Sequence, residues 1–413
     1  MVKQQSAVAE AARHRSVDLS RGTNQSGVRL YNERLILSLV RRHGSLAKAE
    51  IARLTGLSAQ TISVIMRQLE ADELLIREEP QRGRVGQPSV PLSLNPNGAF
   101  FLGMKVGRRS SDLVLLDFLG KVRGSLHEPY RYPVPQDVLD FTRRAVDELI
   151  GRLPRKARNR ISGIGIAAPF ELWNWEEQIG APRAVLDLWR NFDIKEEVAR
   201  LVPWPVYFCN DATAACGAEM VLGNPTHALD FLYVFVGSFV GGGIVLNGSL
   251  YPGRTGNAGA LGSMPMPVRL TMGGPSQQLI RSASVYLLAD QLLGAGRDPS
   301  VLWRSPDDWG DIGPELDRWI ERASISLAGA AVAATSVIDF ETIIIDGAFP
   351  PDVRRRMVER TAAAMMAFDR QGLSPVKVIE GTIGSGARAI GGACLPLLAD
   401  FTRDRELLFK EGG

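Results

Sequence analysis

The sequence has little cysteine, little histidine and no long apolar run. Its 413 residues include 3 cysteines, Cys209, Cys216 and Cys394, and 4 histidines. So few scattered cysteines exclude a disulfide framework and favour a reducing compartment. The longest weakly polar stretch, residues 325–338, falls short of the ~20 residues of a spanning helix, and we interpret it as a buried helix. Met1–Gly22 lacks the apolar core of a signal peptide. We therefore expect a soluble cytoplasmic protein with no membrane contact.

Charge is nearly balanced over the whole chain but uneven along it. The formal net charge is +3. Residues 1–98 hold 14 basic and 9 acidic side chains, a net of +5, so the remainder carries −2. A basic N-terminal segment ahead of a mildly acidic body predicts a polyanion-binding module joined to a second function.

Residues 28–96 have the pattern of a winged helix-turn-helix, after a non-periodic arm over residues 1–27. We expect Asn32 to cap a first helix and Ser45 to cap a second. In the turn Thr55-Gly56-Leu57-Ser58 the glycine can take a positive φ, and Ser58 can cap a third helix. The apolar face of that third helix consists of Ile62, Ile65, Met66 and Leu69.

The opposite face of the third helix is polar, and a basic, glycine-rich tip at residues 81–88 lies between two short strands. We predict that these two regions contact DNA. The predicted DNA contacts are Ser58, Gln60, Thr61, Ser63, Arg67, Arg82 and Arg84. A small structural bundle with solvated arginines is the alternative. The agreement of turn, cap, polar face, wing and charge favours DNA binding.

From residue 97 onward strands and helices alternate, which is typical of an α/β fold. A strand–turn–strand unit at residues 100–117 recurs at residues 231–246, with a glycine-rich turn over residues 237–243. This recurrence predicts two lobes with a cleft between them. We place the first lobe at residues 97–211, with residues 380–413 returning to it, and the second at residues 212–379.

The sequence resembles the ROK family (repressor, open reading frame, kinase), and within it the transcriptional regulators of the NagC, XylR and Mlc group. The resemblance rests on Gly22-Thr23-Asn24-Gln25, the turn and wing described above, Asn210-Asp211-Ala212 and Gly241-Gly242-Gly243-Ile244. It implies an N-terminal winged helix-turn-helix and a two-lobed actin-like (ribonuclease H-like) body of the sugar-kinase type. It also implies a homodimer or tetramer, a small carbohydrate effector and a palindromic DNA operator.

The chain departs from the sugar kinases of this family in three phosphate-binding segments. Lys105 replaces the acidic residue that opens their first phosphate loop, and Arg108 replaces its second glycine. Phe239 fills a glycine position of the second loop, and Asp346 adds negative charge where a polyphosphate would approach. These departures predict no ATP binding and no catalytic residues. We expect Arg108 and its neighbour Arg109 to be solvated surface side chains, with an anion of another kind as the alternative ligand.

The zinc site of the family is also missing. Ser263 stands where its histidine would be, and no cysteine occurs between Cys216 and Cys394. Because tetrahedral zinc needs four close nitrogen or sulfur ligands, we predict no structural zinc.

The sugar site implied by the resemblance is partly kept. The Asp211 carboxylate is expected to accept hydrogen bonds from sugar hydroxyls, and a helix N-cap is its alternative role. Ala260 replaces a glutamate that holds the sugar in relatives. The predicted sugar-binding residues are Asn210, Asp211, Pro169, Phe170, Asn257, Ala260 and Ser263. Trp173, Trp175 and Trp189 follow Pro169, and both stacking on a sugar and core packing remain open for them.

The predicted function is that of a sugar-responsive repressor with a catalytically inactive kinase-like body and neither ATP nor zinc as cofactor. Two alternatives remain. One is an ATP-dependent sugar kinase with a DNA-binding head, and the other is a regulator whose body binds a protein partner. The effector is open among ketoses, pentoses and polyols.

Overall fold

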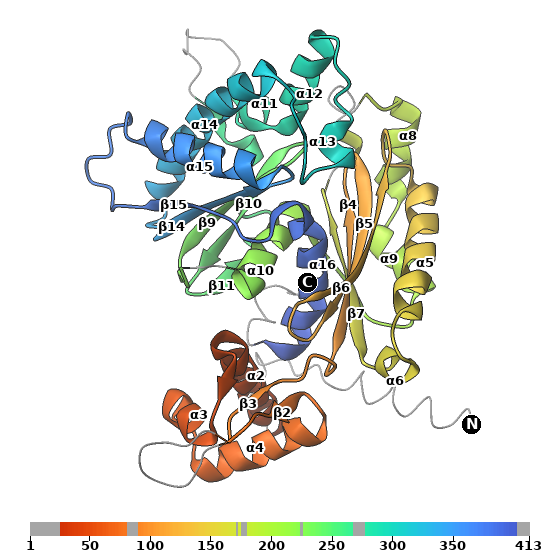
Figure 1. Cartoon of the computed structure of the whole chain (residues 1–413), viewed down its shortest axis with the longest axis vertical. Coiled ribbons are helices and arrows are strands. Elements are labelled where there is room, and N and C mark those ends of the chain that lie inside the picture. The colour runs from red at the N-terminus through yellow and green to blue at the C-terminus, as the bar shows by residue number, and fades with distance from the viewer. Residues whose placement is uncertain are drawn as a thin grey trace. The chain divides into compact units, whose positions relative to one another are not determined.

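The computed structural model describes residues 25–80, 90–170, 172–174, 180–223, 226–266 and 277–402 (Figure 1). The chain divides into two compact units, which we call the N-terminal unit (Met1–Gly98 with Ala399–Gly413) and the body (Ala99–Leu398). This division differs from our expectation that residues 380–413 return to the first lobe, because the residues from Ala399 onward group with the N-terminal unit. Within the described ranges, no helix has the length and apolar character needed to cross a membrane.

The N-terminal unit is a winged helix-turn-helix. Its elements are α2 (Gln25–His43), β1 (Ser45–Leu46), α3 (Lys48–Thr55), α4 (Ala59–Ala71), β2 (Leu75–Arg77) and β3 (Leu92–Leu94), with strand order β1-β3-β2. Gly56 takes a φ of 69° between α3 and α4. The Ser58 hydroxyl accepts a hydrogen bond from the Thr61 amide at 3.1 Å, so the predicted turn and cap are confirmed. The four predicted apolar residues of α4 are all buried.

Two expected helix caps in this unit are wrong. Asn32 lies inside α2, which begins at Gln25. Ser45 belongs to β1 and pairs with Ser93 of β3, and α3 begins after Ala47. Since this strand pairing joins residues far apart in the sequence, a local capping pattern could not reveal it.

The first sheet of the body has the strand order β6-β5-β4-β7-β8. Its strands are β4 (Phe100–Val106), β5 (Ser110–Asp117), β6 (Val122–Pro129), β7 (Ile161–Ala168) and β8 (Val206–Asn210). The connecting helices are α5 (Pro135–Gly151), α6 (Arg155–Arg158), α8 (Arg183–Asp187) and α9 (Ile194–Leu201). Figure 1 shows α5 and α9 on one side of this sheet and α16 (Ala387–Phe401) on the other.

The second sheet repeats the arrangement of the first, with the order β11-β10-β9-β14-β15. In each sheet three antiparallel strands are followed by two parallel ones. The strands are β9 (Phe231–Val236), β10 (Val240–Leu246), β11 (Ser249–Tyr251), β14 (Thr342–Gly347) and β15 (Lys377–Glu380). The recurring sequence pattern predicted two such lobes, and the actin-like arrangement is the one that the resemblance implied. Strand β10 includes residues 240–243, so the expected turn shortens to residues 237–239.

Helices of the second half cover the second sheet. They are α10 (Asp211–Leu222), α11 (Ile280–Ala283), α12 (Val285–Gly294), α13 (Val301–Arg304), α14 (Pro314–Thr335) and α15 (Pro351–Met365). The stretch over residues 325–338 is buried only in part. It includes the end of α14 with buried Ala328 and Ala331, whereas Val337 is 82% exposed.

Two glycines allow α16 to lie close against the first sheet. A Cβ at Gly103 of β4 would lie 2.1 Å from the Ala389 carbonyl oxygen, and one at Gly165 of β7 would lie 1.9 Å from that of Gly392. Real Cβ atoms do not approach so closely, so glycine is required at both positions. Helix α16 begins in the body and its last residues belong to the N-terminal unit. There the Arg34 Nε of α2 donates to the Asp400 carbonyl at 3.2 Å.

Candidate ligand site and nucleic-acid interface

The predicted pair Asn210 and Asp211 lies where β8 ends and α10 begins. The Asn210 side-chain oxygen accepts hydrogen bonds from the amides of Ala212 (3.1 Å) and Thr213 (3.4 Å), so it caps α10. The cap role that we considered for Asp211 therefore belongs to Asn210. The carboxyl end of a parallel strand is the usual place of a ligand crevice in α/β proteins.

A cavity of about 430 Å³ opens at this edge of the sheet. Its volume is within the roughly 300–1,000 Å³ typical of small-molecule sites. Every residue that we predicted to bind a sugar lines this cavity. They are Pro169, Phe170, Asn210, Asp211, Asn257, Ala260 and Ser263. We call this the Asp211 cavity.

The far wall of the Asp211 cavity is the loop that carries Asn257 and Ala260. Gly259 in this loop has a φ of +77°, and a Cβ there would lie 2.7 Å from the Gly243 Cα of β10. The glycines of the loop and of β10 therefore permit a backbone-to-backbone approach that larger residues would prevent. Asn257, Ala260 and Ser263 are exposed at the mouth of the cavity.

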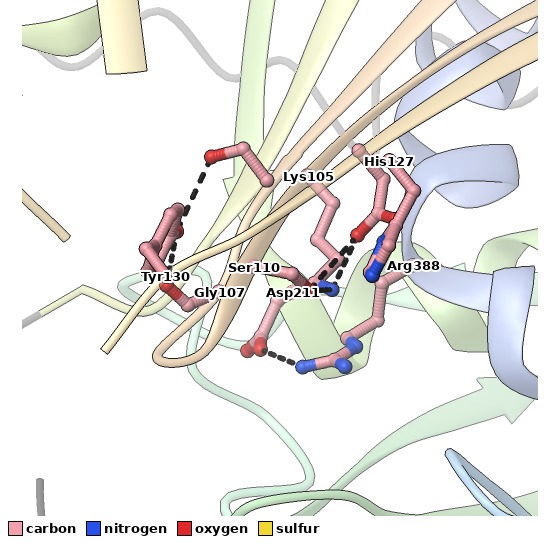
Figure 2. A network of polar contacts seen from close by, with 9 residues as sticks. Lys105, Gly107, Ser110, His127, Tyr130, Asp211 and Arg388 are labelled. Atoms are coloured by element: carbon pink, nitrogen blue, oxygen red, sulfur yellow. Dashed lines mark hydrogen bonds and ion pairs between the residues drawn. The ribbon is translucent and has the colours of Figure 1, made fainter. Parts of the chain in front are cut away.

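Arg388, in the first turn of α16, reaches the Asp211 carboxylate (Figure 2). Its guanidinium nitrogen lies 3.4 Å from Asp211 Oδ2, and the two residues are only 7% and 9% exposed. Sequence reasoning missed this partner, which lies 177 residues further along the chain. The available signal was an arginine inside the glycine-rich segment of residues 381–392.

Lys105 is neutralised inside the first lobe, as Figure 2 shows. Its ammonium donates to Ser110 Oγ at 2.6 Å and pairs with the Asp112 carboxylate. His127 Nδ1 lies 2.5 Å from the other Asp112 oxygen. Burial lowers the pKa of Lys105. Burial opposes ionisation of Asp112 as well, but Lys105 and His127 together hold its pKa well below the usual range.

A half-buried tyrosine, Tyr130, fixes the turn between β4 and β5. The Tyr130 hydroxyl donates to the Gly107 carbonyl at 2.7 Å and contacts Ser111 Oγ at 3.2 Å (Figure 2). Burial raises the pKa of Tyr130, which keeps the hydroxyl protonated. The turn that carries Arg108 is thereby held in one position.

The expectation of a solvated Arg108 is wrong. Arg108 is only 9% exposed, and its guanidinium carbon lies 3.9 Å from the centroid of the Phe239 ring. Burial lowers the pKa of Arg108 to about 10, an effect that Arg388 adds to and Asp211 opposes. Phe239, which fills a glycine position of the kinase loop, is thus the platform on which this arginine lies. Arg109 is half-buried, with its guanidinium carbon 5.1 Å from the centroid of the Trp303 ring.

Our interpretation of Asp346 is also wrong. Asp346 is fully buried and does not present its charge to a ligand. Its carboxylate accepts hydrogen bonds from the Tyr233 hydroxyl (3.1 Å) and the Gly384 amide (2.9 Å), and pairs with Arg354 at 3.1 Å. Asp346 therefore joins β9, β14 and the start of the glycine-rich segment.

A second cavity, of about 360 Å³, adjoins the turn after β4, and we call it the arginine cavity. Arg108 lines both this cavity and the Asp211 cavity. Its other charged lining residues are Lys105, Arg109, Arg304, Arg388, Asp112 and Asp307, together with His127.

Of the three tryptophans after Pro169, Trp189 belongs to the core. It is buried, and its indole nitrogen donates to the Pro133 carbonyl at 3.0 Å. Trp173 is half-buried against the same core cluster, and Trp175 lies outside the described residues.

The described part of the chain contains no group of three or more His, Cys, Asp or Glu side chains placed to hold a metal ion. Ser263 is exposed in the 3-10 turn Leu261–Ser263. Burial raises the pKa of Cys209 to about 12, so its thiol is protonated and a poor metal ligand at neutral pH.

The predicted DNA-contacting residues of α4 lie on the face opposite its core. Ser58, Gln60 and Arg67 are exposed, and Thr61 and Ser63 are half-buried. The Ser58 oxygen is engaged in the helix cap, and Arg67 Nε donates to the Ser63 carbonyl at 3.1 Å. The structure also places an apolar residue there, Val64, which is exposed. Arg82 and Arg84 lie outside the described residues.

Comparison with known proteins gives a family match for each of the two units. Residues 101–278 match the ROK family, and residues 31–84 match the MarR family. The xylose repressor of Bacillus spizizenii is 24% identical over 241 residues, which cover 58% of this chain and 62% of the repressor. The structure is similar to that of a ROK family transcriptional regulator, a homologue of the Escherichia coli Mlc protein. The match spans 92% of this chain and 98% of that regulator, with a TM-score of 0.66 and 22% identity. It is also similar to a ROK family glucokinase from Streptomyces griseus, solved with glucose and AMPPNP. That match spans 72% of this chain and 99% of the glucokinase, with a TM-score of 0.55 and 19% identity.

Proposed function

We propose that the chain is a cytoplasmic, carbohydrate-responsive transcriptional repressor of the ROK family, on the match of residues 101–278 to that family and of residues 31–84 to the MarR family. The observation that carries the proposal is the presence of two sites in one chain. A winged helix presents a polar face, and the body holds a small-molecule cavity around Asp211. The similarity to a xylose repressor supports the same combination.

DNA binding is assigned to α4 of the N-terminal unit. The helix inserts into the major groove, where Gln60, Thr61 and Ser63 face base edges and Arg67 a phosphate. A homodimer or tetramer presents two such helices, so the operator is palindromic, with half-sites about one helical turn apart.

Effector binding is assigned to the Asp211 cavity. A buried carboxylate accepts two hydroxyl hydrogen bonds from a carbohydrate, and its charge strengthens them. Arg388 holds this carboxylate in place. Apolar walls from Phe170 and Phe239 suit the carbon face of a sugar ring.

Helix α16 is the proposed route between the two sites. Its first turn carries Arg388, which pairs with Asp211, and its last turn accepts the hydrogen bond from Arg34 of α2. A ligand that changes the Asp211–Arg388 pair therefore acts on the start of the same helix. The effect on operator affinity is limited to the ligand's differential affinity for the two states of the protein.

We propose that the body carries out no phosphoryl transfer, although its fold is shared with a ROK glucokinase. Lys105 and Arg108 replace an acid and a glycine of the kinase phosphate loop, and the Phe239 ring lies against Arg108. A phosphate loop needs close backbone approach, which these side chains obstruct. The same reasoning leaves ATP outside the proposed cofactors, and Ser263 in place of the family's histidine leaves zinc outside them.

The test begins with selection of duplexes from a random DNA library by the full-length protein. Affinity for the selected operator is then measured by fluorescence anisotropy with and without each member of a carbohydrate panel. We expect a palindromic operator and one carbohydrate that weakens binding by about 5- to 150-fold. The absence of any sequence preference would contradict the repressor assignment. Sugar-dependent ADP release from ATP, abolished by Asp211→Asn, would favour the kinase alternative instead.

A further inference from the structure

The segment that joins α5 to β7 is strongly basic. Residues 152–160 hold five basic side chains and no acidic one, and three of the five lie in the four-residue helix α6. The five are Arg152, Arg155, Lys156, Arg158 and Arg160. Among the described lining residues of the Asp211 cavity and the arginine cavity none of the five occurs. Effector binding therefore does not account for this charge.

Two of the five basic side chains have a structural role at the end of α5. Arg158 donates to the carbonyl oxygens of Leu153 (3.1 Å) and Gly151 (3.2 Å), and Arg152 pairs with Glu148. Positive charge at the C-terminus of a helix is favourable, because the last carbonyl oxygens carry partial negative charge. These contacts explain Arg152 and Arg158 without any ligand.

Arg155 and Lys156 have no such role. Both are exposed on α6. Within the residue ranges that the structure describes, neither side chain forms an ion pair or a side-chain hydrogen bond. Their two positive charges are therefore turned to the solvent.

A third exposed cation lies at the same end of the first sheet. Phe100 of β4 pairs with Asp117 of β5 on one side and with Ile161 of β7 on the other. The turn after Asp117 and the segment before Ile161 therefore leave the sheet at one end, where Figure 1 shows α6. Lys121, in that turn, is exposed. We call these three exposed side chains the basic edge: Lys121, Arg155 and Lys156.

The surroundings of the basic edge fit a phosphate backbone better than a protein or a lipid surface. Leu153 is buried in the core of the first lobe and Ala157 packs against that core, so residues 152–160 expose no aromatic or long aliphatic side chain. Protein interfaces centre on such anchors, and membrane-surface segments insert them. A nucleic-acid backbone requires only positive charge. The core contacts of Leu153 and Ala157 also hold the segment in place before binding.

The chain of the body begins at this edge. Its first residue is Ala99, and the amide of the next residue, Phe100, donates to the Arg160 carbonyl at 2.9 Å. In any orientation of the two units, DNA held by the N-terminal unit is thus tethered to the basic edge through the chain. Such a tether raises the local concentration of phosphates around these cations.

We propose that the basic edge of the body binds the phosphate backbone of the same DNA duplex that α4 reads, as a second and sequence-independent contact. This inference rests on the proposed DNA binding and adds a surface of the body to it. Each cation that meets a phosphate releases condensed counterions from the DNA. The contact therefore contributes to affinity and to its salt dependence, and not to the choice of sequence.

The experiment is fluorescence anisotropy of the full-length protein with DNA at several salt concentrations. One duplex carries the selected operator flanked on each side by about two helical turns of DNA, and a second duplex of the same length has a random sequence. The test variant Arg155→Gln with Lys156→Gln removes two charges from the basic edge. The control Arg355→Gln with Lys377→Gln removes an exposed arginine and an exposed lysine from α15 and β15, so its net charge changes equally.

We expect the test variant to lower the slope of log affinity against log salt by about two per protomer, and to weaken binding to both duplexes by about tenfold. The ratio of the affinities for the two duplexes stays the same, because the contact reads no bases. The control variant is expected to match the unmodified protein. Arg155→Lys with Lys156→Arg keeps both charges and is also expected to bind normally. Thermal unfolding verifies that each variant is folded.

The outcomes separate this inference from the proposed function. A test variant with the slope and affinity of the control would overturn the inference, while an intact operator preference leaves the proposed function standing. A lowered slope on a random duplex, in a protein that prefers no operator, would support the inference and contradict the repressor assignment. Normal DNA binding by the test variant, together with lost binding to poly-L-glutamate, would overturn the inference in favour of an acidic protein partner.

Discussion

Breaking the Asp211–Arg388 pair tests whether the candidate site is organised by a buried ion pair. Asp211→Asn removes one charge and keeps the shape of the side chain. Arg388 then stays buried, at 7% exposure, without its carboxylate. Removing one partner of a buried pair costs about 3–5 kcal/mol. We expect a loss of about 3 kcal/mol, at the lower end, because the N···O distance of 3.4 Å exceeds the ~2.7–2.9 Å of strong charge-assisted hydrogen bonds.

The assay is equilibrium unfolding in urea, followed by tryptophan fluorescence. All 7 tryptophans lie between residues 173 and 319, so the signal reports on the body alone. The double variant Asp211→Asn with Arg388→Met removes both charges. We expect its loss to be smaller than the sum of the two single losses by about 1–3 kcal/mol. Strict additivity, or single variants within about 0.5 kcal/mol of the unmodified protein, would refute the reasoning.

Three further predictions concern other parts of the molecule. Arg67→Ala is expected to weaken operator binding and to lower the slope of log affinity against log salt by about one, which anisotropy at several salt concentrations measures, whereas Arg143→Ala leaves both unchanged. Ser58→Ala removes the cap of α4 and is expected to destabilise the N-terminal unit by about 1 kcal/mol, seen as faster amide exchange in that helix and unchanged exchange in the body. The pKa of Asp112 is depressed in the folded body, so its contribution to stability is present above the ordinary pKa of about 4 and is lost as the pH falls through the folded value. Accordingly, the stability difference between the unmodified protein and Asp112→Asn should shrink between about pH 5 and pH 2, and a constant difference would contradict the assignment.

The local parts of the fold could be predicted from the sequence. The turn at Gly56 and the cap at Ser58 depend on neighbouring residues only, and the structure confirms both. Ser45 could not be assigned in this way. It has the residue type of a cap, but pairing with Ser93 in a sheet determines its conformation.

The candidate site likewise has one part that the sequence could predict and one part that it could not. The residues around Asn210 and Asp211 were predicted because the family resemblance places them in a sugar site and the polar pair follows a strand end. The burial of Arg108 could not be predicted, because Arg108 packs against Phe239, which lies in the turn between β9 and β10, far away in the sequence. The partnership of Asp211 with Arg388 likewise depends on how α16 packs, which Gly103 and Gly165 permit through contacts far apart in sequence.

The measurement that tests the central claim most directly is the operator affinity of the full-length protein at saturating carbohydrate. It is made on the unmodified protein and on Asp211→Asn, with the operator obtained by selection. The account predicts that the carbohydrate weakens operator binding by the unmodified protein by at least about fivefold, and that the same carbohydrate leaves the operator affinity of Asp211→Asn unchanged. An unmodified protein whose operator affinity is the same with and without every carbohydrate that binds it would contradict the account.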